Sequence, residues 1–251
     1  MAENSENELK LPKRLNQDLI FEEYSMDGLG EDQKEAMYYV LQHLKTWNEL
    51  PKTPEAQETF KPLRMTLSGV AGSGKSTLIN TLVTAIRKIT QKTNSVYVVG
   101  PTGSAAFNAG GETCHHLFNI KGKQNEFELK PAALLNLMSK LENTVALIVD
   151  ERSMVSALLL GTMEAYCRQT MFKARNCHLR WGGLPIVILV GDDHQLPSID
   201  EGAFHCFEGR TRQRRTKVEN LFVQNGMELF KEFGKDVMTL AASKRVLEGR
   251  V

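Results

Sequence analysis

The spacing of Gly69, Gly74, Lys75 and Ser76 fits the pattern G-x-x-x-x-G-K-S, which is typical of loops that bind nucleoside triphosphates. Such a loop turns backbone N–H groups toward phosphate oxygens, and the helix after it adds the positive end of its dipole. Lys75 would then reach the β and γ phosphates, and the Ser76 hydroxyl would supply a hard oxygen ligand for Mg²⁺. The residues expected to bind the nucleotide in this loop are Gly69, Gly72, Ser73, Gly74, Lys75, Ser76 and Thr77.

Other interpretations of these glycines are weaker. A plain glycine-rich turn before a helix is the structural alternative. The full pattern, however, lies between an apolar run at 65–67 and an apolar helical pattern from Leu78, which is the context that a phosphate loop requires. A dinucleotide-binding loop is excluded, because no glycine stands three residues after Gly74.

A second chemical signal is the pair Asp150 and Glu151, which directly follows an apolar strand predicted at 145–149. A Mg²⁺-dependent triphosphatase needs one acid to hold the metal's water shell and another to orient and deprotonate the attacking water. We therefore assign Asp150 to the metal and Glu151 to the water. Two solvated acids at a strand end are the alternative, which the phosphate loop upstream disfavours.

The elements that position these groups alternate between strands and helices. Buried, β-branched runs at 95–99 and 185–190 predict strands of a parallel sheet, and apolar spacing predicts helices at 31–47, 75–89, 155–170 and 226–234. Polar residues follow two of the strands, with Thr102 and Ser104 after one and Asp192 and Gln195 after the other. Open α/β sheets bind ligands at the carboxyl ends of their strands, so we expect an α/β fold with these loops on one rim.

Three segments leave alternatives open. The turn at 100–106 is also compatible with a plain connection, and Gln33 near a helix start with mere capping or solvation. The basic cluster at 210–217 is either a solvated loop or a contact to a phosphate backbone. Residues 48–62 predict a connecting loop, and residues 237–240 a last strand.

Composition excludes several classes of protein. The net charge is +1, so any nucleic-acid site must be local. The 4 cysteines form no C-x-x-C pair, which indicates a reducing compartment, and Cys177-His178 with His205-Cys206 does not match usual zinc spacing. No apolar segment approaches the roughly 20 residues of a membrane span, and the N-terminus has no hydrophobic signal core. We therefore expect an intracellular protein without a membrane partner.

The ordered set of loops resembles the helicase motifs of one family. The matching segments are Gly69-Val-Ala-Gly-Ser-Gly-Lys-Ser76, Gly100-Pro-Thr-Gly-Ser-Ala-Ala106, Asp150-Glu-Arg-Ser-Met154 and Gly191-Asp-Asp-His-Gln-Leu-Pro197. They are similar to those of superfamily-one 5′→3′ DNA helicases of the petite-integration-frequency (Pif) and RecD-like group, which includes Helitron-type helicases. The resemblance implies a RecA-like P-loop NTPase domain with a parallel sheet flanked by helices.

The resemblance also implies roles for further residues. Leu29-Gly-Glu-Asp-Gln33 looks like the family's Q motif, in which Gln33 would hydrogen-bond adenine and select ATP. Gln195 would sense the γ-phosphate, and Arg245 would approach it from the domain boundary. The residues implied to contact single-stranded nucleic acid are Thr102, Gly103, Ser104 and His115.

The sequence departs from the family's pattern at Arg152, where an apolar residue is usual, at Asp193-His194, where aromatic residues are usual, and at Val246 after Arg245. The resemblance covers about residues 29–246 and only a first motor domain. We expect a flexible segment at 1–28, an ATPase domain at 29–240 and the start of a linker at 241–251.

The expected function is an ATP-dependent, Mg²⁺-dependent 5′→3′ helicase that moves on single-stranded DNA, present as its first domain. Its expected partners are the DNA strand and a second RecA-like domain of the same full-length chain, with the protein a monomer. A regulatory nucleotide-binding module without motor activity and an RNA-dependent ATPase are the alternatives. The expected location is a nucleus, a mitochondrion or a host cell carrying a virus or transposon.

Overall fold

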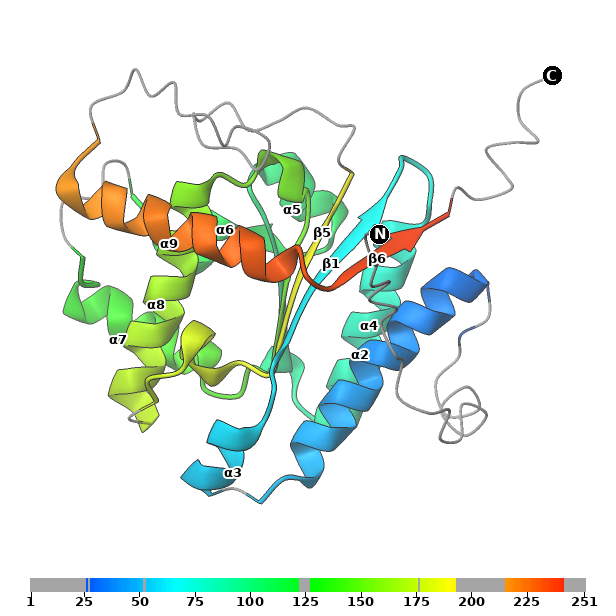
Figure 1. Cartoon of the computed structure of the whole chain (residues 1–251), viewed down its shortest axis with the longest axis horizontal. Helices are drawn as coiled ribbons and strands as arrows, with labels where there is room; N and C mark the ends of the chain where they lie inside the picture. The colour runs from blue at the N-terminus through cyan, green and yellow to red at the C-terminus, as the bar shows by residue number, and fades with distance from the viewer. Residues whose placement is uncertain are drawn as a thin grey trace, which may run out of the picture.

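The computed structural model describes residues 26, 28–51, 53–121, 127–175, 177–192 and 215–241. Its centre is a 6-stranded sheet with the order β3-β2-β4-β5-β1-β6, in which every pair of neighbouring strands is parallel. The strands are β1 (Leu63–Gly69), β2 (Val96–Gly100), β3 (Glu112–Thr113), β4 (Ala146–Val149), β5 (Ile186–Gly191) and β6 (Val237–Leu240). The predicted α/β fold with a parallel sheet is confirmed (Figure 1).

Both faces of the sheet are covered, which explains why its central strands read as continuous apolar runs. All residues of β4 and β5 are buried. Because successive side chains of a strand point to opposite faces, Leu147 and Val149 join one hydrophobic cluster while Ala146 and Ile148 join the other.

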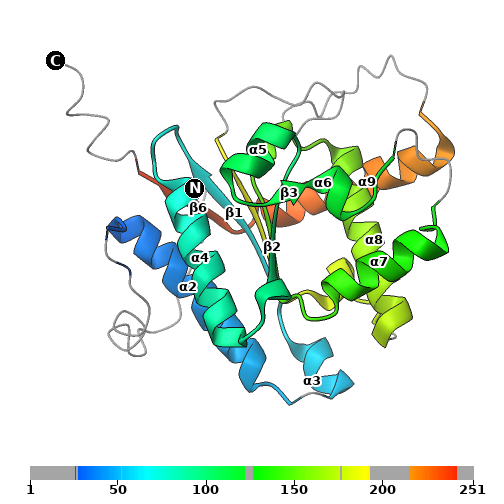
Figure 2. The same cartoon turned by 180° about the vertical axis from the view of Figure 1, so that it is seen from behind.

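Two helices cover one face of the sheet. They are α2 (Glu31–Glu49) and α4 (Lys75–Thr90), which lie side by side in Figure 2. Met37, Leu41 and Leu44 of α2 and Leu78 and Leu82 of α4 are buried at helical spacing. Both helices agree with their predicted ranges to within two residues.

Three helices cover the other face. They are α7 (Pro131–Leu141), α8 (Ala157–Arg175) and α9 (Lys217–Phe233), visible on the left of Figure 1. Their core includes the buried side chains of Trp181, Phe222 and Phe233.

The predicted bounds of the last helix are wrong, because α9 begins at Lys217 rather than at residue 226. Thr216 and Glu219 form a capping box at its start: the Thr216 hydroxyl accepts from the Glu219 N–H at 3.0 Å, and the Glu219 carboxylate accepts from the Thr216 N–H at 2.8 Å. Gly226 interrupts the helical pattern in the sequence. It is there because α8 passes so closely that a Cβ at Gly226 would lie 1.8 Å from the Ala157 carbonyl oxygen.

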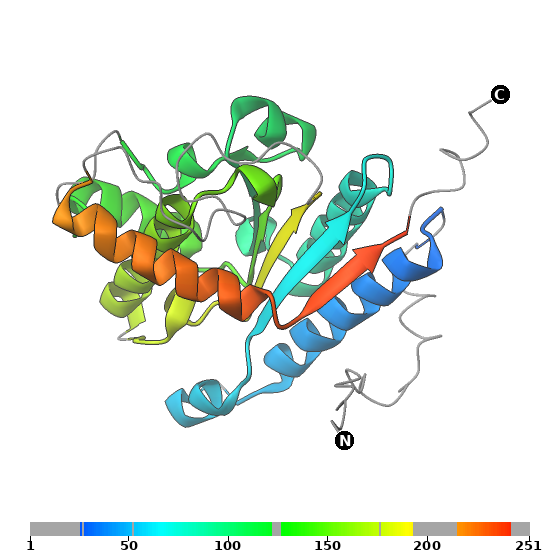
Figure 3. The same cartoon turned by 45° about the horizontal axis from the view of Figure 1, so that its top comes forward.

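The shorter elements connect these layers. The predicted loop at 48–62 contains a helix, α3 (Pro54–Thr59), with Thr53 as its N-cap. At the carboxyl edge of the sheet lie α5 (Gly103–Asn108) and α6 (Cys114–Leu117), and 3₁₀ turns occur as η1 (Thr93–Ser95), η2 (Arg152–Met154) and η3 (Arg180–Gly183). Figure 3 shows β1, β5 and β6 running toward the same edge. None of the helices in the described ranges is both long and apolar enough to cross a membrane.

Candidate active site

The phosphate-loop segment connects the end of β1 at Gly69 to the start of α4 at Lys75. Gly72 and Gly74 have φ values of 80° and 81°, which L side chains rarely adopt, and the Ser73 N–H donates to the Val70 carbonyl at 3.1 Å. The glycines therefore allow the tight curl that brings successive peptide groups around one concave surface.

Lys75 folds back on this loop. Its ammonium donates to the carbonyl oxygens of Gly69 at 2.6 Å and Val70 at 3.0 Å. These contacts hold a positive charge at the carboxyl end of β1, next to the backbone that would surround a phosphate chain.

Gln33 reaches the same loop from α2. Its amide nitrogen donates to the Ser73 carbonyl oxygen at 2.8 Å, and its amide oxygen accepts from the Gly30 N–H at 2.9 Å. The side chain is buried, with 8% of the residue exposed. The predicted site residues Gln33, Ser73 and Lys75 are therefore brought together.

Asp150 and Glu151 follow β4 at the same edge of the sheet. Asp150 is 8% exposed and accepts from the Glu151 N–H at 2.9 Å. Burial raises the pKa of Asp150, while that hydrogen bond and the Lys75 charge oppose the rise. The pKa of Glu151 is also raised, first by burial and then by the charges of Asp150 and Asp192, against the effect of Lys75. Glu151 is therefore close enough to feel the charges of Lys75, Asp150 and Asp192, which follow β1, β4 and β5.

Glu151 has a strained backbone. Its φ of 52° and ψ of 49° lie in the left-handed region, which is uncommon for a residue with a side chain. Backbone conformations of this kind cluster at functional sites, where the surrounding structure enforces them. Here this conformation turns the chain sharply between β4 and η2 and leaves Glu151 partly exposed beside the buried Asp150.

Arg152 stands where the resemblance predicts an apolar residue. It is 6% exposed, and a Cβ on Gly191 would lie 2.7 Å from its Cγ. Its aliphatic stem therefore packs against β5 and takes the space of an apolar side chain.

The oxygen atoms of Ser76 and Asp150 suit Mg²⁺, a hard cation that is often held by one or two protein groups together with substrate phosphates. A buried carboxylate whose pKa is raised by burial is the kind of group that a cation would stabilise. Within the described ranges there is no cluster of three or more His, Cys, Asp or Glu side chains that would form a complete protein site for a metal.

The residues predicted to contact nucleic acid lie on two short helices that both contact β3. Thr102 is the N-cap of α5, accepting from the Ala105 N–H at 3.2 Å, and its hydroxyl lies 3.1 Å from that of Ser104. Gly103 and His115 are exposed. In Figure 2, α5 and α6 lie together at the upper edge of the sheet.

Phe107 is a candidate that sequence reasoning missed. It lies on α5 with 85% of its surface exposed, on the same helix as Ser104. Its exposure follows from its place after Ala105 and Ala106: these two are buried, and the helical turn carries the next residue outward.

Several predicted residues lie outside the described ranges. They are Gln195, Arg245, Asp193-His194, Val246, His205-Cys206 and most of the basic cluster, of which only Arg215, Thr216 and Lys217 are described. The roles predicted for them stay predictions.

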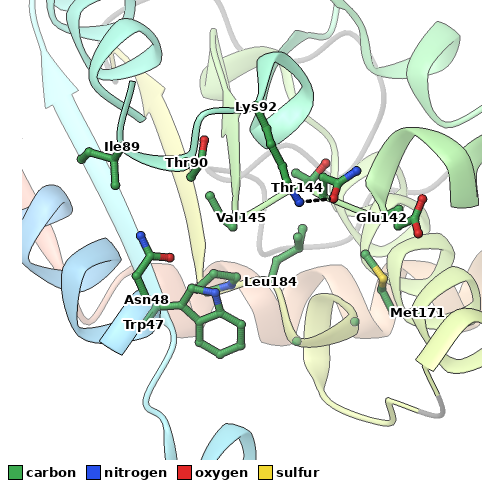
Figure 4. A pocket seen from close by; sticks show the side chains of 14 residues that line it. Trp47, Asn48, Ile89, Thr90, Lys92, Glu142, Thr144, Val145, Met171 and Leu184 are labelled. Atoms are coloured by element: carbon green, nitrogen blue, oxygen red, sulfur yellow. Dashed lines mark hydrogen bonds between the residues drawn. The ribbon is translucent and has the colours of Figure 1, made fainter. Parts of the chain in front are cut away.

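A cavity of about 410 Å³ lies at the opposite edge, near the amino ends of β4 and β5 (Figure 4). Its wall includes Trp47, Thr144, Leu184 and Lys92, whose ammonium donates to the Asn143 side chain at 2.6 Å. None of the residues predicted to bind nucleotide lines this cavity, so the chemistry is expected at the carboxyl edge.

Comparison with known proteins agrees with this geometry. Residues 53–220 match the family model of PIF1-like helicases. The ATP-dependent DNA helicase PIF1 of Saccharomyces cerevisiae is 35% identical over 137 residues, which are 53% of this chain and 15% of that protein. The ATP-dependent DNA helicase Pif1 of Campylobacter jejuni is 32% identical over 141 residues, 53% of this chain and 28% of that protein. This chain thus spans less than a third of the length of either relative.

Solved structures share the fold. Unliganded Pif1 from Bacteroides sp matches with a TM-score of 0.57 at 24% identity, covering 85% of this chain and 41% of that one. Pif1 helicase from Candida albicans also matches with a TM-score of 0.57, at 23% identity, over 88% of this chain and 42% of that one. With two thirds of its residues matched by the family model and its loops in the family's order, the chain belongs to the PIF1-like helicases.

Proposed function

We propose that this domain hydrolyses ATP for a 5′→3′ helicase that moves along single-stranded DNA. The observation that carries the proposal is geometric: the Lys75 ammonium lies on the phosphate loop at the carboxyl end of β1, and Asp150 and Glu151 follow the parallel strand β4 at the same edge of the sheet. The Lys75 charge opposes the rise in the pKa of both carboxyl groups, so the three groups lie close enough to share one site. Relatives named ATP-dependent DNA helicases support the choice of nucleotide and of substrate.

Each group has a part in hydrolysis. The loop N–H groups and Lys75 would hold the β and γ phosphates and offset their charge, and Glu151 would orient the attacking water and accept its proton. Ser76 and Asp150 would hold Mg²⁺, which supplies further neutralisation of the phosphate charge when bound. The raised pKa of Glu151 suits a general base, because a base works best when its pKa lies nearer the working pH.

The nucleic-acid surface would be formed by α5 and α6. Thr102, Gly103 and Ser104 offer hydroxyl and backbone groups for phosphate oxygens, and His115 adds a further polar contact. The exposed ring of Phe107 would stack on a base, a contact that tolerates any sequence.

Other parts of the motor are proposed from the family alone. Gln195 would sense the γ-phosphate, and Arg245 would approach it from the boundary with a second RecA-like domain of the complete protein. That complete protein would work as a monomer inside the cell.

The test is ATP turnover by the complete protein that carries this domain, measured with single-stranded DNA, with single-stranded RNA and without either. We expect stimulation by DNA, and a loss of about 10²–10⁴-fold for Glu151→Gln with nucleotide binding kept. Unchanged turnover in Glu151→Gln would refute the assignment of the base. Binding without turnover under all three conditions would indicate a regulatory module, and stimulation by RNA alone an RNA-dependent ATPase.

A further inference from the structure

We propose that Gln33 is a positioning residue of the phosphate loop, which orients the Ser73–Gly74 peptide for polyphosphate binding whatever base the nucleotide carries. This inference rests on the proposed nucleotide site. It assigns to Gln33 a contribution to every polyphosphate ligand, in addition to any contact with a base.

The side-chain amide of Gln33 is held at both ends by the protein itself. Its nitrogen donates to the Ser73 carbonyl oxygen at 2.8 Å, and its oxygen accepts from the Gly30 N–H at 2.9 Å. Reading adenine with two bonds requires the oxygen and an N–H of one amide together. The contacts to Ser73 and Gly30 instead fix the plane of the Gln33 amide against the loop. One N–H and one oxygen lone pair of the amide then remain for a base.

The contact with Ser73 determines which way a loop N–H points. The described residues contain no cis peptide bond, and in a trans peptide the C=O and the N–H point in opposite directions. Since the Ser73 carbonyl points to Gln33, the Gly74 N–H points to the other side of the loop. A phosphate loop binds its anion through N–H groups turned in this way.

Gly74 and Gln33 also fit each other in space. Gly74 has a φ of 81°, and a Cβ there would lie 2.1 Å from the Gln33 amide nitrogen. The amide therefore packs directly on the part of the loop where the chain turns into α4. A rotation of the Ser73–Gly74 peptide would break this contact and leave the Ser73 carbonyl without its partner in a buried position.

Gln33 is anchored by contacts of its own helix. The Gln33 N–H donates to the Asp32 carboxylate at 2.9 Å, and α2 buries Met37, Val40 and Leu41 against the sheet. The packed helix α2 thus sets the position of the amide and, through it, the orientation of the Ser73–Gly74 peptide.

The first experiment measures binding of ADP, GDP and inorganic tripolyphosphate to this chain by calorimetry. We expect Gln33→Ala to weaken all three about equally, by about tenfold, because a buried carbonyl loses its hydrogen bond. Gln42→Ala, the same chemical change farther along α2, is the matched control and should bind as the wild type does.

The outcomes separate this inference from the proposed function. A loss confined to ADP would make Gln33 a reader of the base only and overturn the inference, as would unchanged binding of all three. If the wild-type chain bound none of the three, the nucleotide site itself would be wrong. Thermal melting without ligand shows whether Gln33→Ala stays folded.

A second pair of variants distinguishes positioning from a general effect on folding. Gln33→Met keeps the size of the side chain and removes its hydrogen bonds, whereas Gln33→Glu keeps the acceptor and gains an O–H donor only when protonated. Asp32 accepts a hydrogen bond from the Gln33 N–H, and Lys75 directly follows the Ser73–Gly74 peptide in the sequence. All the variants share these two charged groups.

Tripolyphosphate binding by each variant is then compared with the wild type at the same pH. As the pH is lowered, we expect Gln33→Glu to recover beyond Gln33→Met, because the new O–H donates to Ser73. If binding by Gln33→Glu recovered only to the level of Gln33→Met, the recovery would be explained by neutralisation of the Glu carboxylate alone. That result would contradict the inference.

Discussion

At the scale of single residues, the site brings function into conflict with stability. Asp150 is buried, and burial raises its pKa because the apolar surroundings disfavour the ionised carboxylate. A carboxyl whose pKa is raised on folding contributes stability at low pH, and this is lost as the pH rises through the raised pKa. At neutral pH and without a cation, Asp150 therefore favours unfolding.

We accordingly predict that Asp150→Asn raises the melting temperature of the ligand-free protein at pH 7, while removing the dependence of nucleotide binding on Mg²⁺. The Asn side-chain oxygen still accepts from the Glu151 N–H, but no buried charge remains. Scanning calorimetry across pH checks this: the difference from wild type should shrink as the pH falls and Asp150 takes up its proton. A variant less stable than wild type at pH 7 would contradict the argument.

Phe107 leads to a second prediction at this scale. If its ring stacks on a base, Phe107→Ala should weaken binding of a single-stranded oligonucleotide by about tenfold, since one stacking contact contributes roughly 1–3 kcal/mol. Fluorescence anisotropy measures this, and Phe107→Trp should retain binding. Phe172→Ala, at an exposed phenylalanine of α8, is the control. Equal effects of the two alanine variants would refute a specific role for Phe107.

At the scale of elements, close contacts between neighbours set the geometry. Helices α8 and α9 cross at Gly161 and Gly226, where an added Cβ would meet backbone atoms of the other helix at 1.9 Å and 1.8 Å. On the other face, α2 forms hydrogen bonds to the phosphate loop and to the residues on either side of β6. Gln33 bonds to the phosphate loop, Asp32 to the Ala241 N–H, and Tyr39 to the Asp236 carboxylate at 3.1 Å.

The helix crossing predicts a large effect of a small substitution. We expect Gly226→Ala to destabilise the domain by about 1–3 kcal/mol, because α9 must move away from the backbone of α8. For a domain of this size that corresponds to a melting temperature lower by roughly 2–12 °C. Gly234→Ala is the control, since its Cβ would meet its nearest neighbour at 3.4 Å. Equal melting temperatures for the two variants would show that the helices are not in close contact at Gly226.

At the scale of the whole molecule, the sheet separates two hydrophobic clusters and brings the loops to one edge. One cluster lies under α2 and α4, the other under α7, α8 and α9. Because every strand is parallel, the phosphate loop after β1, the acids after β4 and Asp192 after β5 share the carboxyl edge.

A ligand at this edge should stabilise the whole domain. At about 100 times its dissociation constant, ADP with Mg²⁺ should add about 2.7 kcal/mol to the free energy of unfolding, which raises the melting temperature by roughly 5–10 °C. Differential scanning fluorimetry measures the shift. Lys75→Ala should remove most of it, and a full shift in that variant would place the ligand elsewhere.

The sequence alone determined the chemical core of the site. The loop at Gly69 to Ser76 has its chemistry within eight consecutive residues, and Asp150 and Glu151 follow a strand that its own apolar run identifies. Continuous apolar runs predicted strands that are buried on both faces, as in a parallel sheet. The common direction of these strands predicted which loops share an edge. These features depend on residues that are adjacent in the sequence, or on the pattern of apolar residues that burial requires along a strand or helix.

Only the tertiary structure decided features that depend on which elements lie side by side. The bond from Gln33 to Ser73 joins residues 40 positions apart. The sequence predicted that both segments bind the same nucleotide, but it did not predict that they contact each other. The start of α9 was misjudged because Gly226 interrupts its pattern, for a reason that exists only where α8 crosses it. The exposure of Phe107 and the place of β6 beside β1 are likewise results of packing, which acts between segments that the sequence keeps far apart.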